Sequence, residues 1–283
     1  MIIGFLGKGG SGKSTLATLY TKHLVSQGAY VLAIDADHNM DLSYNLGAPE
    51  NFPFFGTTGA QFLIDTFGSE SKLCSDLLTL EKPPIFKLEK NVDAFTKKYS
   101  HIISNNLSFM STGPHNDMIL HGNKCSHSLG TPLKVYLPLL ELDENQHVVV
   151  DMIASSDAAA TGIPTGFSFA YVAVEPTPHS IKAAGQIIET LKFFDVPYGI
   201  VLNKAKNADT DIEMIESVLH EKPVSVFMQS NDPLNENMYT KELESLYTYA
   251  DLHTKKHGDR RKIRSIEKMR RNQEFKLQNQ AGR

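Results

Sequence analysis

The stretch FLGKGGSGKSTL, residues 5–16, follows a short apolar run and leads into a helical pattern. Residues 7–14 satisfy G-x-x-x-x-G-K-[ST], in the strand–loop–helix setting that gives this pattern its meaning. Because its glycines carry no side chain, the backbone can curl until successive N–H groups point inward, where the positive end of the helix favours an anion. The sequence therefore predicts a phosphate-binding loop. The residues expected to contact the nucleotide are Gly9, Gly10, Ser11, Gly12, Lys13, Ser14 and Thr15.

Three polar side chains of this loop have separate expected roles. Lys13 can reach the β and γ phosphates of a nucleoside triphosphate, and the Ser14 hydroxyl can ligate Mg²⁺. Lys8 is a second lysine that the loop geometry does not require, because Lys13 already supplies the cation. Lys8 is therefore either a solvated loop residue or a cation that acts outside its own loop.

Apolar runs of strand length alternate with helical patterns along the chain, which predicts an α/β fold with a mostly parallel, helix-flanked sheet. The expected strands are residues 2–6, 30–34, 107–110, 148–150, 169–174, 198–202 and 224–227. The expected helices are residues 14–27, 133–142, 179–194, 209–220 and 237–280. Ligands of such folds bind at the carboxyl ends of the strands, so functional residues should follow each apolar run.

The chain is expected to divide into a nucleotide-binding domain, residues 1–254, and a basic tail, residues 255–283. Residues 51–104 lack the strand–helix rhythm and are expected to form an insertion or a helical cap over the sheet edge. The tail holds eleven Lys or Arg against three Asp or Glu, a net charge of +8, whereas the remainder carries seventeen against twenty-nine, a net charge of −12. A basic, helical tail could contact nucleic acid, anionic lipid or an acidic partner, or could be only a solvated helix.

Composition points to a globular, cytoplasmic protein. The 283 residues are 41% hydrophobic, enough for a full core, and no segment approaches the roughly 20 apolar residues that span a bilayer. The apolar run at residues 1–6 is too short for the core of a signal peptide. Two cysteines are too few for a disulfide framework, which fits a reducing compartment. Cys74, in an apolar segment, is expected to be a small core residue.

Acidic residues follow two of the expected strands. Asp35 and Asp37 end the second run, where two carboxylates can hold the hydration shell of Mg²⁺ and orient a water. Asp151 ends the run VVVD in the manner of a Walker B segment and is expected near Ser14 and Mg²⁺. Asp41 is expected to cap a helix. The small residues 154–162 suit a switch loop; in that loop, Asp157 is a candidate member or an ordinary exposed carboxylate.

The pattern K-G-G-x-G-K-[ST] at residues 8–14 resembles the deviant Walker A ATPases, which include MinD, ParA, the nitrogenase iron protein and the CooC accessory ATPases. The resemblance runs from residue 1 to about residue 243. It implies ATP hydrolysis by a sandwich homodimer that ATP assembles, in which Lys8 crosses the interface to the partner's nucleotide. By the same resemblance, Asp35 lies near Mg²⁺, Asp37 positions the attacking water, and Asn203 hydrogen-bonds adenine. ATP is expected rather than GTP, because position 206 is Lys and the carboxylate that reads guanine is absent.

Several segments are similar to the CooC branch, which helps to insert nickel into an enzyme. They include NVDAFTKKYS at 91–100, NLSFMSTG at 106–113 and VVVDM at 148–152. The CooC feature C-x-C becomes Cys125 and His127 here. Two such pairs in a dimer would offer an S₂N₂ set for Zn²⁺ or Ni²⁺, with His115 and His121 as substitutes. The simpler alternative is an ordinary loop.

Two classes of function follow from the resemblance. One is a CooC-like accessory ATPase for metallocofactor maturation, with a metalloenzyme client. The other is a ParA- or MinD-like positioning ATPase that binds DNA without sequence preference through the basic tail. Membrane attachment is disfavoured, because Ile263, Ile266 and Met269 make only a short apolar stripe.

Overall fold

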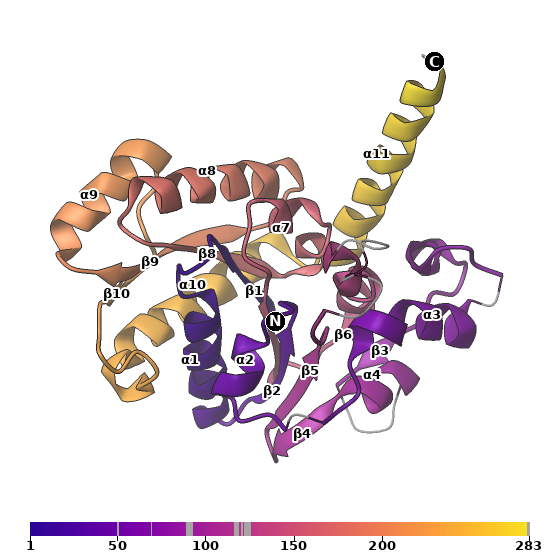
Figure 1. Ribbon diagram of the computed structural model, residues 1–283, viewed down its shortest axis with the longest axis horizontal. Coiled ribbons are helices and arrows are strands. Elements are labelled where there is room, and N and C mark those ends of the chain that lie inside the picture. Colours follow the sequence, from indigo (N-terminus) through magenta and orange to yellow (C-terminus); the bar gives the residue numbers. More distant parts are fainter. Residues whose placement is uncertain are drawn as a thin grey trace.

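The computed structural model describes residues 1–49, 51–68, 70–88, 93–115, 119, 121 and 126–281. At its centre is an eight-stranded sheet in the order β10-β9-β8-β1-β7-β2-β5-β4, with helices on both faces (Figure 1). All its strand pairs are parallel except that of β4 (His101–Ser104) with β5 (Leu107–Ser111). The expected fold class is confirmed. The other strands of this sheet are β1 (Ile2–Gly7), β2 (Tyr30–Asp35), β7 (Gln146–Asp151), β8 (Phe169–Val174), β9 (Tyr198–Ala205) and β10 (Ser225–Met228).

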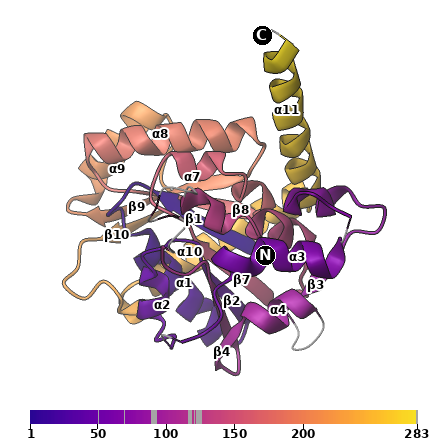
Figure 2. The ribbon, with the colours of Figure 1, turned by 45° about the vertical axis from the view of Figure 1, so that its right-hand side comes forward.

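Both faces of the sheet are buried, which explains why its strands read as nearly continuous apolar runs. Along β1, Ile2 and Leu6 belong to the hydrophobic cluster that α8 (Pro178–Phe193) covers, whereas Ile3 and Phe5 belong to the opposite cluster. Helices α1 (Lys13–Ser26) and α10 (Thr240–His257) cover the second cluster, and α9 (Ala208–Leu219) lies beside α8 (Figures 1 and 2). The helices expected at 14–27, 179–194 and 209–220 are therefore present as α1, α8 and α9.

The prediction of a helix at residues 133–142 is wrong after Tyr136, where α6 (Leu133–Tyr136) ends. The structure has α6, a 3₁₀ turn η3 (Leu137–Leu139) and strand β6 (Leu140–Glu141). Pro138 lacks a backbone N–H, so it cannot continue the α-helical hydrogen-bond ladder. The chain then extends and pairs in parallel with β3 (Phe86–Lys87).

The segment at 51–104 supplies β4, the edge strand that pairs with β5, and its helix α3 (Phe55–Phe67) contacts β5 (Figure 1). Its elements are α3, the 3₁₀ helix η1 (Cys74–Thr79), β3, α4 (Ala94–Tyr99) and β4. Aromatic side chains join it to the body: the Phe95 and Phe86 rings lie 5.0 and 5.1 Å from the ring of Tyr136. Cys74 is buried, as expected, and burial raises the pKa of its thiol to about 12. The short elements not yet named are α2 (Asp41–Asn45), η2 (Ser126–Gly130), α7 (Asp157–Ala160), η4 (Pro164–Gly166) and η5 (Glu236–Met238).

The expected helix at 237–280 is two helices, because Gly258 adopts φ +66° and ends α10. The second helix, α11 (Arg261–Ala281), begins against the body and then projects away from it (Figures 1 and 2). Of the expected apolar stripe, Ile266 packs against the core while Ile263 is 50% exposed, so the stripe does not form one free face. No helix in the described part of the chain is long and apolar enough to cross a membrane.

Buried arginines anchor the start of α11. Arg264 donates hydrogen bonds to the carbonyl oxygens of Thr165 at 3.3 Å, Asp195 at 3.0 Å and Phe167. Arg261 donates to two further carbonyls, those of residues 137 and 140, each at 3.0 Å. The first turn of the basic tail is therefore part of the folded body.

We expect Arg264→Ala to lower the free energy of unfolding by about 3 kcal/mol, because it leaves three carbonyl groups without their donor. Urea denaturation followed by circular dichroism measures this loss. Lys262 is exposed and lies two residues before Arg264, so Lys262→Ala is the control and should stay within about 0.5 kcal/mol of wild type. Equal stability of the two variants would contradict the anchoring role.

Candidate nucleotide site

The loop at residues 7–12 joins the carboxyl end of β1 to α1, as expected. Gly10 and Gly12 adopt φ +82° and +88°, in the region that favours glycine. A Cβ at Gly12 would lie 2.1 Å from the Asn203 amide nitrogen, and one at Gly7 would lie 2.6 Å from the Ala173 carbonyl oxygen. The loop is therefore held closely by β8 and β9, and glycine is required at these positions.

The two lysines of the loop occupy opposite environments. Lys13 is 5% exposed, and its ammonium donates to the carbonyl oxygen of Lys8 at 3.3 Å. Burial lowers the pKa of Lys13, whereas the carboxylates of Asp151 and Asp37 raise it. The Lys8 side chain is exposed and makes no hydrogen bond or ion pair within the described residues. Only Lys13 therefore serves the interior of its own loop.

The rest of the expected phosphate loop lies at the start of α1. Gly9 and Gly10 are exposed, while Ser14 and Thr15 are half-buried in the first helical turn. Ser11 is fully buried, and its hydroxyl has no hydrogen-bond partner in the described structure. The expected contact residues therefore lie together at the end of the loop and in the first turn of α1, with Lys13 buried among them.

Asp151, at the end of β7, is completely buried, and neither carboxylate oxygen has a hydrogen-bond partner of good geometry among the described residues. Burial raises its pKa to about 7, whereas the neighbouring Ser14 hydroxyl and Lys13 ammonium lower it. A buried carboxylate without donors, beside a serine hydroxyl, fits a hydrated Mg²⁺ at this position. In the described part of the chain no three His, Cys, Asp or Glu side chains form a chelating group. The arrangement therefore suits a cation that a bound nucleotide also ligates.

Asp35 lies next to Asp151, because β2 and β7 pair with these two residues in register. Burial, and then the charge of Asp151, raise the pKa of Asp35 well above its usual range. Its carboxylate accepts hydrogen bonds from the Ser43 N–H at 3.0 Å and the Asp37 N–H at 3.1 Å. Asp35 thus caps α2 from the end of a strand. The expected capping role of Asp41 is wrong: Asp41 is exposed and makes no cap hydrogen bond.

Asp37 is 7% exposed and close enough to Lys13 to raise the pKa of that lysine. Its carboxylate accepts from the Asn39 N–H at 3.1 Å and lies 3.5 Å from Nδ1 of His38. The His38 ring stacks on His115, with centroids 3.9 Å apart. The structure therefore places Asp37 beside the phosphate loop, together with a histidine pair whose His38 member the sequence analysis did not single out.

A brace from β9 holds the phosphate loop. Asn203 donates from its amide to the Ser11 carbonyl oxygen at 2.9 Å. Lys204, with φ +57°, donates to the Gly10 carbonyl oxygen at 2.5 Å and pairs with Glu175 at 2.6 Å. Sequence reasoning places Asn203 and Lys204 at a strand end but assigns no role to Lys204 or to Glu175. Contact of Asn203 with adenine stays a prediction.

Other expected residues fall elsewhere. Cys125 and the side chain of His127, the candidate transition-metal ligands, lie outside the described residues. Asp157 is exposed at the start of α7. The loop before it approaches the phosphate loop, because a Cβ at Gly9 would lie 3.7 Å from Ala154.

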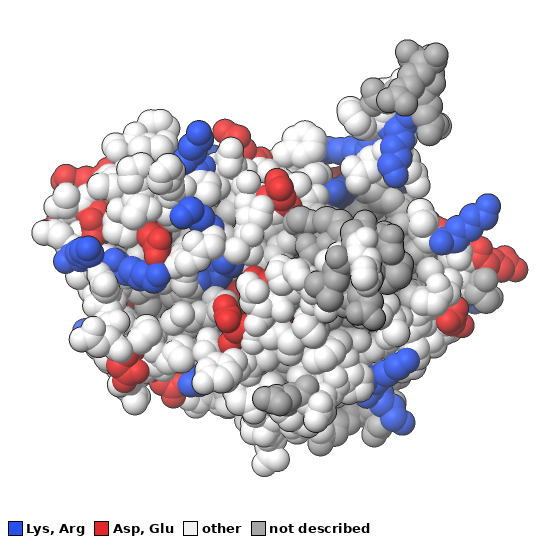
Figure 3. All heavy atoms as spheres, in the orientation of Figure 1, with Lys and Arg blue, Asp and Glu red and all other residues white. Residues whose placement is uncertain are grey.

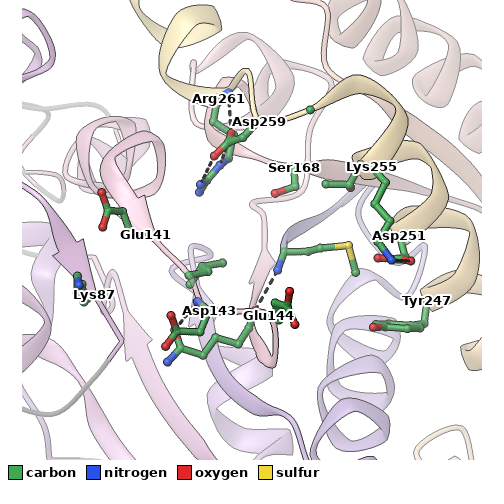
Figure 4. A pocket seen from close by; sticks show the side chains of 15 residues that line it. Lys87, Glu141, Asp143, Glu144, Ser168, Tyr247, Asp251, Lys255, Asp259 and Arg261 are labelled. Atoms are coloured by element: carbon green, nitrogen blue, oxygen red, sulfur yellow. Dashed lines mark hydrogen bonds and ion pairs between the residues drawn. The ribbon is translucent and has the colours of Figure 1, made fainter.

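A cavity of about 900 Å³ lies away from this site (Figure 4). Met1 and Gln146, at the amino ends of β1 and β7, line it, whereas the phosphate loop follows the carboxyl end of β1. Two ion pairs, Asp259 with Arg261 and Asp251 with Lys255, occupy its wall (Figure 4). The cavity is therefore separate from the candidate nucleotide site.

A glycine-rich loop between β1 and α1, with a buried lysine facing acidic residues at the ends of β2 and β7, defines a P-loop nucleotide-binding protein. Residues 2–243 match the sequence profile of the CbiA family, the CobQ/CobB/MinD/ParA nucleotide binding domain. The chain belongs to this family.

Similar proteins cover nearly the whole chain. The ATP-binding protein MJ0084 of Methanocaldococcus jannaschii is 25% identical over 248 residues, 87% of this chain and 94% of that protein. The ParA family ATPase of Chlorobium tepidum has a TM-score of 0.58 at 17% identity, covering 95% of this chain and 98% of its own. MinD of Pyrococcus horikoshii, solved with Mg-ADP, has a TM-score of 0.56 at 17% identity, covering 89% and 98%. These structural matches establish the shared fold.

We expect Asp151→Asn to stabilise the nucleotide-free protein above pH 7. The raised pKa means that the folded state binds a proton more tightly than the unfolded state, so wild type loses stability as pH rises from about 4 to 7. The variant lacks that loss and should gain on the order of 2 kcal/mol at pH 8, with the gain shrinking toward pH 4.

Urea denaturation at pH 4.5, 6 and 8 tests this expectation. Asp157→Asn, six residues further on and exposed at the start of α7, is the control and should behave as wild type at each pH. A variant less stable than wild type at pH 8 would show that the Asp151 charge is compensated in the free protein.

Proposed function

We propose that this protein is an ATP-hydrolysing switch in which two copies join around bound ATP. The observation that supports the proposal most strongly is the division between the two loop lysines. Lys13 is buried inside its own loop, whereas Lys8 is exposed and unpaired within the described residues. The Lys8 ammonium lies outside its own nucleotide site but next to the phosphate loop. It could therefore contact the nucleotide of a second copy that approaches face to face.

Within one copy, the chain's own groups bind and orient the nucleotide. Lys13 would exchange its weak bond to the Lys8 carbonyl oxygen for the β and γ phosphates. Asp37, beside the loop, would orient the attacking water by accepting a hydrogen bond from the water O–H. When bound with ATP, Mg²⁺ would neutralise charge on the phosphates, held by Ser14 with Asp151 and Asp35 behind it.

Two segments could report the presence of the terminal phosphate. Asp35 ties the end of β2 to the first turn of α2 through Ser43, so a change at the cation would reach α2. On the other side, the loop from Ala154 leads directly into α7. Both connections are short, which favours switching by loop rearrangement.

ATP is preferred over GTP in this proposal. Position 206 is Lys, and the next buried carboxylate, Asp211, already accepts hydrogen bonds from the Lys206 N–H at 2.8 Å and the Asn207 N–H at 3.1 Å. That carboxylate is committed to the turn before α9. It therefore does not supply the acceptor pair that guanine requires.

We expect Lys8→Ala to retain ATP binding but to lose ATP-dependent dimerisation and to hydrolyse ATP about 10²–10³-fold more slowly, because a charge on the transferring phosphoryl group loses its partner. Light scattering with a non-hydrolysable ATP analogue and a phosphate-release assay measure the two losses. Lys13→Ala should instead lose nucleotide binding itself.

Lys22→Ala, on the far part of α1, is the surface-lysine control and should match wild type in both assays. Dimerisation and hydrolysis of Lys8→Ala at wild-type levels would overturn the trans role. Metal analysis of the dimer fraction addresses the narrower proposal that the switch serves metallocofactor maturation, which rests on the sequence resemblance and on Cys125 and His127.

A second candidate role, non-specific DNA binding, is favoured by the position of α11. This helix projects from the body, and Lys and Arg side chains lie along it (Figures 1 and 3). Lys262, Arg270 and Lys276 are exposed on it. A projecting basic helix can track a phosphate backbone without reading bases.

For this second role we expect the triple variant Lys262→Gln, Arg270→Gln and Lys276→Gln to bind duplex DNA about tenfold more weakly than wild type and with a shallower salt dependence. Fluorescence anisotropy at 50–200 mM salt measures both. Truncation before α11 is unsuitable, since Arg261 and Arg264 anchor the fold. Lys72→Gln with Lys82→Gln is the control, and binding that does not differ between the two sets would exclude α11 as the DNA contact.

A further inference from the structure

A cavity of about 270 Å³ lies where α11 faces the body, apart from both the nucleotide site and the cavity of Figure 4. Its walls come from segments far apart in the sequence: η1, the start of α6, the turn at 161–165 and α11. Cys74, Leu78 and Met269 make part of the wall apolar. The cavity has room for about nine water-sized groups at ~30 Å³ each, enough for a small organic molecule.

The charged groups of this cavity are all positive. Lys134 from α6 and Lys268 from α11 line it, with Lys276 at its rim, and no Asp or Glu is among its described lining residues. Neither the Lys134 ammonium nor the Lys268 ammonium has a hydrogen-bond or ion-pair partner in the described structure; the Lys268 ammonium lies 5.0 Å from the centroid of the Phe194 ring. Burial lowers the pKa of both lysines, and the charge of Lys134 lowers that of Lys268 further. Two partly buried cations thus face one space without a counter-ion.

We propose that this cavity binds a small amphipathic anion, a single carboxylate or phosphate group on a short apolar body. The anionic group would lie between Lys134 and Lys268, where it offsets their mutual repulsion. The apolar body would lie against Leu78 and Met269. The Thr165 hydroxyl contributes little to binding, because it is already hydrogen-bonded to the Gly162 carbonyl oxygen and to the Ser265 hydroxyl, each at 2.8 Å.

The cavity also adjoins the loop that follows Asp151. Gly162 adopts φ +94°, and a Cβ there would lie 2.9 Å from Cε of Lys268, so the turn and the lysine are in close contact. An anion that fixes Lys268 would therefore restrain the turn after α7. Control of ATP hydrolysis through that turn rests on the proposed function, whereas binding of the anion does not.

Isothermal titration calorimetry of the full chain with hexanoate and with hexyl phosphate tests the proposal, with hexanol and hexylammonium as matched neutral and cationic probes. We expect one site per chain for at least one anion, and binding at least about tenfold weaker for the other two probes. The amide resonance of Gly162 should shift with the same saturation curve.

The double variant Lys134→Met with Lys268→Met keeps the side chain as far as Cε and removes two unpaired, partly buried charges, so it should unfold at the same or higher urea concentration than wild type. It should bind the anion at least about tenfold more weakly, while Lys262→Met, exposed on the same helix, binds as wild type does.

Unsaturable titration with both anions, equal binding of hexylammonium, or unchanged affinity of the double variant would each overturn the proposal. A change in the ATP hydrolysis rate on adding the anion, absent in the double variant, supports the coupling to the turn. If the protein hydrolyses no ATP at all, the proposed function fails, but the calorimetry still decides whether the cavity binds an anion.

Discussion

The structure depends on a group of buried charges at the carboxyl end of the central strands. The strand order places β7 between β1 and β2, and the register aligns Asp35 with Asp151 beside the lysine that opens α1. Two adjacent carboxylates in a dry interior disfavour each other's ionisation, and one lysine offsets only part of that cost. Asp35 accepts hydrogen bonds from the backbone N–H groups of Asp37 and Ser43, whereas Asp151 has no hydrogen-bond donor of good geometry among the described residues. The free protein therefore keeps an unsatisfied group where a cation and phosphates would complete it.

This arrangement explains why the loop is braced so heavily from outside. The phosphate loop has to keep its shape without a ligand, and the carbonyl oxygens of Ser11 and Gly10 face side chains of β9. Asn203 and Lys204 brace the loop by donating hydrogen bonds to the carbonyl oxygens of Ser11 and Gly10. The Asn203 amide also lies where a Cβ at Gly12 would stand, so the brace and the glycine require each other. A residue with such a structural contact can still reach a base with its remaining acceptor.

The sequence predicted the seven parallel strands and three long helices well, because strands buried on both faces leave apolar runs and the helices between them keep a clear period. It predicted less where tertiary contacts decide. Residues 140–141 follow a helical pattern, yet Pro138 ends the helix and pairing with β3 takes over. A cap for α2 was expected from the adjacent Asp41, but Asp35 reaches the same N–H groups from a strand. Lys204 had no motif to mark it, and its role is visible only once β9 lies beside the loop.

The basic tail shows how charge and burial can separate within one segment. By composition, residues 255–283 form a uniform cationic stretch, but the first turn of α11 buries the guanidinium groups of Arg261 and Arg264 among carbonyl oxygens, whereas Lys262 and the cations of later turns, such as Arg270, are exposed. Arg264 donates hydrogen bonds to the carbonyl oxygens of Thr165 and Phe167, and the Ser265 hydroxyl is hydrogen-bonded to the Thr165 hydroxyl. Both acceptor residues come directly after the loop that follows Asp151. A rearrangement of that loop would therefore disturb one of the two buried attachments of the helix, whereas the attachment of Arg261 to the carbonyl oxygens of residues 137 and 140 would remain. Any partner that α11 contacts would then be connected to the nucleotide site through the hydrogen bonds at Thr165 and the chain segment from Asp151 to Thr165, and the strength of that connection would depend on how far the turn at residues 161–165 can move.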